Sequence, residues 1–225
     1  MIVGQNRAVE QFASAWHSRK VHHAWLLAGP KGVGKSTQAL ALAAALQARG
    51  LSVVLTREPG GSDGAEAIRE LLLSGADERF GAEAEALLFA AARADHVRKT
   101  IRPALETGRW VISDRFLDSS LAYQGGAGGL GIEAVRAVNA FALGGTFPDR
   151  TLVLLASEGS DRARARDGET SDRIGGRSDD YHRKVETAFR LIAAEEPDRV
   201  RLVDASGRPE EVTDRLLVAL ADLLP

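Results

Sequence analysis

GPKGVGKS, residues 29–36, is the stretch that decides the fold of this chain. It stands between the short apolar run HHAWLLAG at 22–29 and a segment at 35–49 that carries apolar residues at helical spacing. The stretch fits G-x-x-x-x-G-K-[ST], a strand-to-helix loop whose backbone amides surround a polyphosphate at a helix N-terminus. The sequence therefore predicts a phosphate-binding loop for a nucleoside triphosphate.

The residue types in this loop fit that chemistry. Gly32 and Gly34 let the backbone amides turn inward, and Lys35 can reach the β- and γ-phosphates. Ser36 can ligate Mg²⁺ through its hydroxyl. The predicted nucleotide-binding residues are Gly29, Pro30, Lys31, Gly32, Val33, Gly34, Lys35, Ser36 and Thr37.

The rest of the chain alternates short apolar runs with helical patterns. Besides 22–29, strands are expected at 51–56, 110–113, 151–156 and 200–204. Helices are expected at 5–18, 35–49, 64–73, 81–106, 132–142, 179–194 and 210–223, with a helical turn from 116. Strands that alternate with helices predict an α/β fold in which a five-stranded parallel sheet carries helices on both faces. We expect a single domain over 1–225, with residues 1–20 as an extra helical segment.

A second glycine-rich stretch, GGAGGLG at 125–131, contains the letters of a dinucleotide-binding fingerprint. No apolar strand precedes the fingerprint, which begins at Gly126, because residues 121–125 read LAYQG. The prediction here is a flexible loop.

Composition excludes several classes of protein. Lys plus Arg is 29 and Asp plus Glu is 31, so no basic excess exists to hold a nucleic-acid duplex. The absence of cysteine excludes disulfides, thiolate zinc sites and cysteine nucleophiles. The longest apolar runs are far shorter than a membrane span, so we expect a cytoplasmic protein with neither membrane nor nucleic acid as a partner.

Polar residues follow two of the expected strands. Thr56–Gly61, TREPGG, follows the second strand and Asp114-Arg115 follows the third, so both lie at the ligand-bearing edge of a parallel sheet. Phe89 and Arg93 lie four apart on one helix face. An aromatic plane beside a guanidinium suits a nucleotide base, which can stack on the ring while the arginine reads its edge.

Each of these residues also has a non-functional interpretation. Phe89 could pack in the core, and Arg93 could be a solvated helix charge. Asp114-Arg115 could form a surface ion pair, and Arg57-Glu58 could be solvated loop residues.

Several segments in order resemble the bacterial thymidylate kinases over residues 29–225. They are the phosphate loop, TREPGG, ALLFAAAR, WVISDRFLDSSLAYQGG, the PD before the fourth strand, RARARDGETSDRI and VDAS. The resemblance implies a nucleoside monophosphate kinase of the phosphate-loop type, a homodimer, and transfer of the ATP γ-phosphoryl group to dTMP with Mg²⁺.

The resemblance also implies roles for individual residues. Phe89 would stack on thymine and Arg93 would hydrogen-bond its edge. Arg57 and Arg115 would hold the acceptor phosphate, while Asp114 would support Mg²⁺. The other residues expected to line the acceptor site are Glu58, Ser119, Ser120, Tyr123 and Gln124. Lys35 and Arg115 are two of the four expected catalytic residues.

The other two catalytic candidates, Arg166 and Arg173, lie in an arginine-rich stretch at 160–178. This stretch brackets DGETSD and is too polar for a core, so it suits a mobile lid over the donor phosphates. Closure would bring positive charge to the transferred group and exclude water. Its alternative is a solvated, charged helix end.

Two features depart from the family pattern. Lys31 stands where the family usually has an acidic residue that contacts the acceptor sugar. Residues 1–31 instead resemble the start of the delta-prime clamp-loader subunit of DNA polymerase III. Three alternatives therefore stay open: a kinase for another acceptor, a clamp-loader-like ATP-binding protein, and a catalytically impaired fusion.

Overall fold

The computed structural model describes residues 24–29, 33–75, 79–155 and 177–225. Within these ranges five strands form one parallel sheet, in the order β2-β3-β1-β4-β5. The strands are β1 (Ala24–Ala28), β2 (Val53–Arg57), β3 (Trp110–Asp114), β4 (Arg150–Leu155) and β5 (Val200–Asp204). The predicted five-stranded parallel sheet is confirmed.

Helices connect the strands, as the alternating pattern predicts. They are α2 (Lys35–Gln47), α3 (Asp63–Leu73), α4 (Ala82–His96), α5 (Arg102–Glu106), α6 (Leu117–Ser120), α7 (Ile132–Leu143), α9 (Asp179–Glu195) and α10 (Pro209–Ala219), with π-helical segments η1 (Val97–Ile101) and η2 (Leu121–Ala127). The predicted helix at 5–18 and most of the predicted lid lie outside the described residues.

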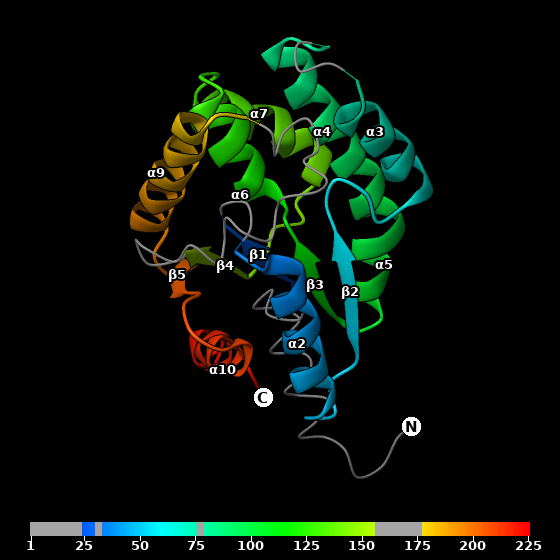
Figure 1. Cartoon of the computed structure of the whole chain (residues 1–225). Coiled ribbons are helices and arrows are strands. Elements are labelled where there is room, and N and C mark those ends of the chain that lie inside the picture. The colour runs from blue at the N-terminus through cyan, green and yellow to red at the C-terminus, as the bar shows by residue number, and fades with distance from the viewer. Residues whose placement is uncertain (1–23, 30–32, 76–78, 156–176) are drawn as a thin grey trace.

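Both faces of the sheet are covered by helices (Figure 1). One core lies between the sheet and the pair α2 and α10, and the other lies under η1, α5, η2, α7 and α9. Successive strand residues point to opposite faces, so Val111 belongs to the second core and Ile112 to the first. Both faces of β3 and β4 are therefore buried, which explains why these strands appear in the sequence as continuous apolar runs, whereas the edge strand β2 is partly exposed.

The long helix predicted at 81–106 is interrupted. It consists of α4, the π-helical turn η1 and α5, joined end to end. Pro103, the second residue of α5, has no N–H group to donate to the preceding turn, and the π-helical turn η1 lies directly before α5.

The flexible loop predicted at 125–131 is wrong for its first residues, because η2 runs to Ala127 and Gly125 is buried. The glycines serve packing. A Cβ atom on Gly126 would lie 2.5 Å from the Cβ atom of Ala188 on α9. Glycine is needed there because a neighbouring helix approaches the backbone closely.

Candidate active site

The described part of the phosphate loop has a backbone that only glycine adopts easily. Gly29, which follows β1, has φ 139°, and a Cβ atom there would lie 2.2 Å from the carbonyl oxygen of Leu154. Gly34, the N-cap of α2, is left-handed with φ 84°. Lys35 is buried at the first position of that helix. The predicted strand and helix are thus in place on either side of the loop, of which Pro30, Lys31 and Gly32 lie outside the described residues.

Ser36 and Asp114 meet at the carboxyl edge of the sheet. The Ser36 hydroxyl, from α2, donates a hydrogen bond to Oδ2 of Asp114 at the end of β3. The other carboxylate oxygen, Oδ1, is buried and has no hydrogen-bond partner among the described residues. A hydroxyl beside a carboxylate with a free oxygen fits Mg²⁺, which is bound in proteins by one or two such groups together with substrate phosphates.

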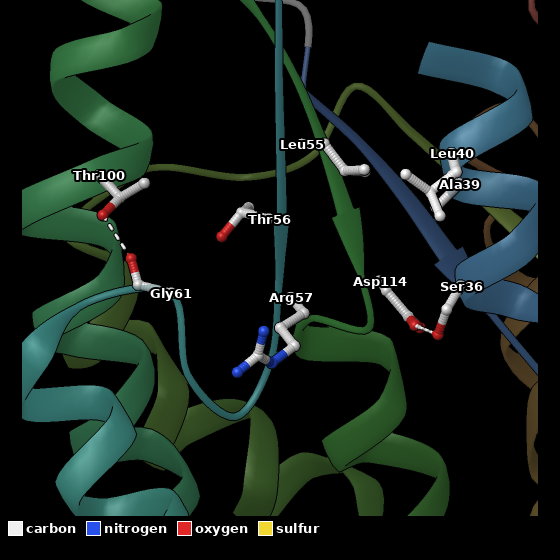
Figure 2. Close-up of a pocket in the computed structure, with 9 residues that line it drawn as sticks. All are labelled: Ser36, Ala39, Leu40, Leu55, Thr56, Arg57, Gly61, Thr100 and Asp114. Atoms are coloured by element: carbon white, nitrogen blue, oxygen red, sulfur yellow. Dashed lines mark hydrogen bonds between the residues drawn. The ribbon is translucent and has the colours of Figure 1, made fainter. Parts of the chain in front are cut away.

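A cavity of about 430 Å³ opens beside this pair (Figure 2). Its lining residues are Ser36, Ala39, Leu40, Leu55, Thr56, Arg57, Gly61, Thr100 and Asp114. Arg57 and Asp114 are register partners on β2 and β3, so the fold places the cation beside the carboxylate. Phe89, Arg93 and the other expected base-site residues do not line this cavity.

An ion pair holds Arg57 in the cavity wall. Its Nη2 atom donates to Glu66 at 3.0 Å, and both side chains are exposed. The pKa of Glu66 is lowered, first because its carboxylate accepts the Gly61 N–H and then because Arg57 lies near, although burial raises it. Arg57 therefore presents a positive charge at the carboxyl edge of the sheet.

Arg115 adopts a conformation that is uncommon for a residue with a side chain. Its φ is 70°, and its carbonyl oxygen accepts a hydrogen bond from the Ser113 hydroxyl at 2.7 Å. Its guanidinium lies 5.1 Å from the ring centre of Tyr123. Strained backbone of this kind is found where a fold presents a side chain to a ligand. The structure thus brings together two residues that the sequence assigned to the acceptor site.

Arg93 is a buried, fully engaged cation rather than a solvated helix charge. It is 2% exposed, its Nε atom donates a hydrogen bond to Glu58 at 2.8 Å, and its Nη2 atom forms an ion pair with the same carboxylate oxygen at 2.8 Å. Its Nη2 atom also donates to Ser120 at 3.0 Å, and Nη1 donates to Asn139. Phe89, one turn earlier on α4, is half-buried. The structure therefore brings Arg93 into contact with Ser120, and both residues were expected to line the acceptor site.

Glu58 is engaged by protein groups through both carboxylate oxygens. Oε2 contacts Arg93, and Oε1 lies 3.0 Å from Nδ1 of His96. The opposite ring nitrogen of His96 lies 2.7 Å from the Thr56 hydroxyl. A buried chain of polar side chains thus links the end of β2 to α4.

Two hydroxyls near these residues have no partner in the described part of the chain. The Ser119 and Tyr123 hydroxyl oxygens are both buried and make no hydrogen bond there. Buried hydroxyls usually find a partner, so their presence suits a polar ligand. The remaining expected residue, Gln124, is buried and donates to Glu85 at 3.1 Å.

Four residues of this network were not predicted from the sequence: Glu85, His96, Asn139 and Arg177. A signal existed for two of them. Glu85, Phe89, Arg93 and His96 fall on one stripe of α4 at helical spacing. Polar residues on a buried stripe indicate paired interactions. Asn139 comes from α7 and Arg177 from the bend before α9, so neither had a local signal.

Comparison with known proteins gives one consistent result. The family model described as thymidylate kinase matches residues 27–216. The thymidylate kinase of Rhizorhabdus wittichii is 62% identical over 201 residues, covering 88% of this chain and 97% of that protein. The chain belongs to the thymidylate kinase family.

More distant members agree. A thymidylate kinase of Rhodopseudomonas palustris is 49% identical over 196 residues, covering 85% of each chain. A crystal structure of thymidylate kinase from Ehrlichia chaffeensis matches with TM-score 0.72 at 28% identity, covering 89% of this chain and 98% of that one. The phosphate-loop kinase fold is thus confirmed.

Membership of the thymidylate kinase family makes the protein a nucleoside monophosphate kinase, and the clamp-loader alternative is not favoured. The resemblance of residues 1–31 to the delta-prime subunit stays a prediction, since the family model begins at residue 27. No helix in the described ranges is both long and apolar enough to cross a lipid bilayer.

Proposed function

We propose that this protein transfers the γ-phosphoryl group of ATP to dTMP, giving ADP and dTDP for dTTP synthesis in the cytoplasm. The observation that carries the proposal is the juxtaposition of Ser36, Asp114 and Arg57 at one cavity beside the phosphate loop. This arrangement supports a site in which the phosphate loop, a candidate Mg²⁺ site and a candidate acceptor-binding cation act together. The thymidylate kinases of Rhizorhabdus wittichii and Rhodopseudomonas palustris, to which the chain is similar, support dTMP as the acceptor.

The proposed mechanism works by alignment and charge neutralisation, without a covalent enzyme intermediate. Lys35 and the loop amides would hold the donor phosphates. Arg57 and Arg115 would hold the acceptor phosphate in line with them, and Arg166 and Arg173 would stabilise the charge on the transferred group. Ser36 and Asp114 would hold Mg²⁺, which offsets phosphate charge when bound.

Acceptor recognition would involve the α4 stripe. Phe89 would stack on the thymine ring and Arg93 would donate to its edge. The buried free hydroxyls of Ser119 and Tyr123 support a polar ligand next to these residues.

The first experiment is Mg²⁺-ATP-dependent ADP release with dTMP, dUMP, CMP and AMP as separate acceptors and a control without acceptor. Release stimulated chiefly by dTMP is the expected result. Stimulation chiefly by another nucleotide would indicate a kinase for a different acceptor. No stimulation in protein that still binds ATP would identify a catalytically impaired fusion.

Lys31 is the proposed weak point of the loop, because it places positive charge where the family usually has an acid. The variant Lys31→Glu is expected to raise turnover with dTMP several-fold. Equal or lower turnover would show that this lysine is compatible with the reaction.

We propose that residues 1–225 form one kinase domain in which residues 1–20 are dispensable for chemistry. Deletion of residues 1–20 should leave turnover unchanged. Loss of turnover in a deletion variant that unfolds at the same urea concentration as the full chain would contradict this.

A homodimer is also proposed, and light scattering on the purified protein should give twice the mass of one 24.0 kDa chain.

A further inference from the structure

Two hydrogen bonds join α4 to the α6–η2 segment on either side of Phe89. At one end Arg93 donates through Nη2 to Ser120 at 3.0 Å, and at the other Gln124 donates through Nε2 to Glu85 at 3.1 Å. Glu85, Phe89 and Arg93 are each four residues apart on one helix face. Phe89 therefore lies midway between the two contacts, and a ring stacked on it would have Arg93 on one side and Gln124 on the other.

Glu85 fixes which end of the Gln124 amide faces it. Glu85 is 2% exposed, and its Oε2 atom accepts a hydrogen bond from Nη2 of Arg177 at 2.8 Å. A carboxylate paired with a guanidinium can only accept hydrogen bonds, so the amide group turned toward it must be the NH₂ end. The carbonyl oxygen of Gln124 then points away from Glu85, and no residue in the described ranges donates to it.

A further contact keeps Arg177 in place. Its guanidinium lies 4.6 Å from the ring centre of Tyr181 and donates to that hydroxyl at 2.6 Å. The Tyr181 hydroxyl in turn donates to the backbone carbonyl of Tyr123 at 2.8 Å. The cation that holds Glu85 is thus anchored to the same segment that carries Gln124.

On the other side of Phe89, Arg93 offers a hydrogen-bond donor, whereas Gln124 offers an acceptor. Of its five N–H groups, four are engaged by Glu58, Ser120 and Asn139. The fifth, on Nη1, has no acceptor among the residues that the structure describes. Phe89 is thus flanked by a free donor on Arg93 and a free acceptor on Gln124.

We propose that Glu85, held by Arg177, is a positioning residue that orients Gln124 and makes the site select a pyrimidine with a 4-carbonyl and an N3–H. The inference rests on the proposed function, in which Phe89 stacks on the acceptor base. Thymine presents an acceptor at O4 beside a donor at N3, which matches Arg93 and Gln124. Cytosine presents the reverse pattern, so both contacts would fail and leave buried polar groups unpaired.

The test is the variant Glu85→Gln, assayed by kcat/KM with dTMP, dCMP and dUMP. A glutamine at 85 can donate or accept, so Gln124 can turn over and present its NH₂ group to the base. We expect the preference for dTMP over dCMP to fall by about tenfold, which corresponds to about one hydrogen bond. The preference for dTMP over dUMP should stay within about twofold of the wild-type value, because uracil presents the same O4 and N3–H groups as thymine. A general structural defect would not lower the dTMP/dCMP ratio while leaving the dTMP/dUMP ratio unchanged.

Two further variants sharpen the test. Glu83→Gln, which changes an exposed acid in the first turn of the same helix, should leave both ratios unchanged. Gln124→Met should lower the dTMP preference over dCMP, and adding Glu85→Gln to it should have no additional effect, because Glu85 acts only through Gln124. Unchanged discrimination in Glu85→Gln, or additive effects in the double variant, would overturn the inference.

A structure of the wild-type protein with dTMP tests the proposal even if Glu85→Gln does not fold. Gln124 should lie within hydrogen-bond distance of N3 while it still contacts Glu85. A Gln124 amide remote from the base would overturn the inference. Absence of any dTMP phosphorylation by the wild-type protein would instead count against the proposed function, so the two failures are distinguishable.

Discussion

Glu58 and Arg93 form a buried ion pair in which both Nε and Nη2 of the guanidinium lie 2.8 Å from one carboxylate oxygen. The pair joins the segment after β2 to the middle of α4, and both side chains are at most 4% exposed. The sequence assigned both residues to the acceptor site. In the structure the Glu58 carboxylate binds the Arg93 guanidinium. Glu58 would therefore affect a bound ligand indirectly, because it orients Arg93.

Removal of Glu58 should therefore destabilise the fold strongly. Glu58→Ala leaves the Arg93 charge buried without its carboxylate, which costs about 3–5 kcal/mol of unfolding free energy. Urea denaturation followed by circular dichroism measures this. The matched control, Glu186→Ala, removes the exposed partner of Arg190 and should cost at most about 1 kcal/mol. Equal losses in the two variants would contradict the role of burial.

Gly29→Ala should disrupt the phosphate loop. The added Cβ atom meets the carbonyl oxygen of Leu154 at 2.2 Å, and the positive φ adds strain of about 1–3 kcal/mol. ATP affinity, measured by calorimetry, should fall at least about tenfold. Gly81→Ala is the control, since its φ is −65° and the nearest atom to an added Cβ lies 3.7 Å away. An alanine at 29 with normal ATP affinity would show that the loop can shift.

Asp114→Asn should weaken Mg²⁺ dependence without unfolding the protein. The variant keeps a partner for the Ser36 hydroxyl but loses the negative charge that suits Mg²⁺. Titration of Mg²⁺ at saturating ATP and dTMP should show half-maximal rate at a concentration raised about tenfold or more. If the Mg²⁺ curve does not move, Asp114 has no part in holding the ion.

Tyr181 should make stability sensitive to high pH. The pKa of its hydroxyl is raised from the ordinary value of 10.0 to about 12. Burial is the main cause, and it outweighs the nearby Arg177 charge, which lowers the pKa. Because the folded pKa is raised, the neutral hydroxyl contributes stability fully below about pH 10, and this contribution is lost as pH rises toward 12.

The comparison with Tyr181→Phe isolates this effect. The excess stability of the wild-type protein over the variant, from urea denaturation, should be constant up to about pH 9.5 and shrink above it. A difference that stays constant up to pH 11.5 would show that the hydroxyl does not keep its proton longer in the folded state.

Local patterns were sufficient for the order of elements. Apolar runs and helical periodicity predicted every strand of the described sheet to within a few residues, and G-x-x-x-x-G-K-[ST] located the connection between β1 and α2. Strands, helices and this connection depend on residues that are close together in sequence, so the sequence alone is enough to predict them. The glycine-rich stretch at 125–131 failed because its conformation depends on the approach of α9, which lies far away in sequence.

Local sequence patterns were enough to predict the fold class, which the structure confirms, and to propose a phosphate loop and an acceptor site, which stay predictions. Only the tertiary structure decided the strand order β2-β3-β1-β4-β5, the engagement of Glu58 by Arg93, and the contact of Glu85 with both Gln124 and Arg177. The physical reason is that a buried polar group must find its partner wherever packing brings one close. Such partners come from segments distant in sequence, so no local pattern specifies them.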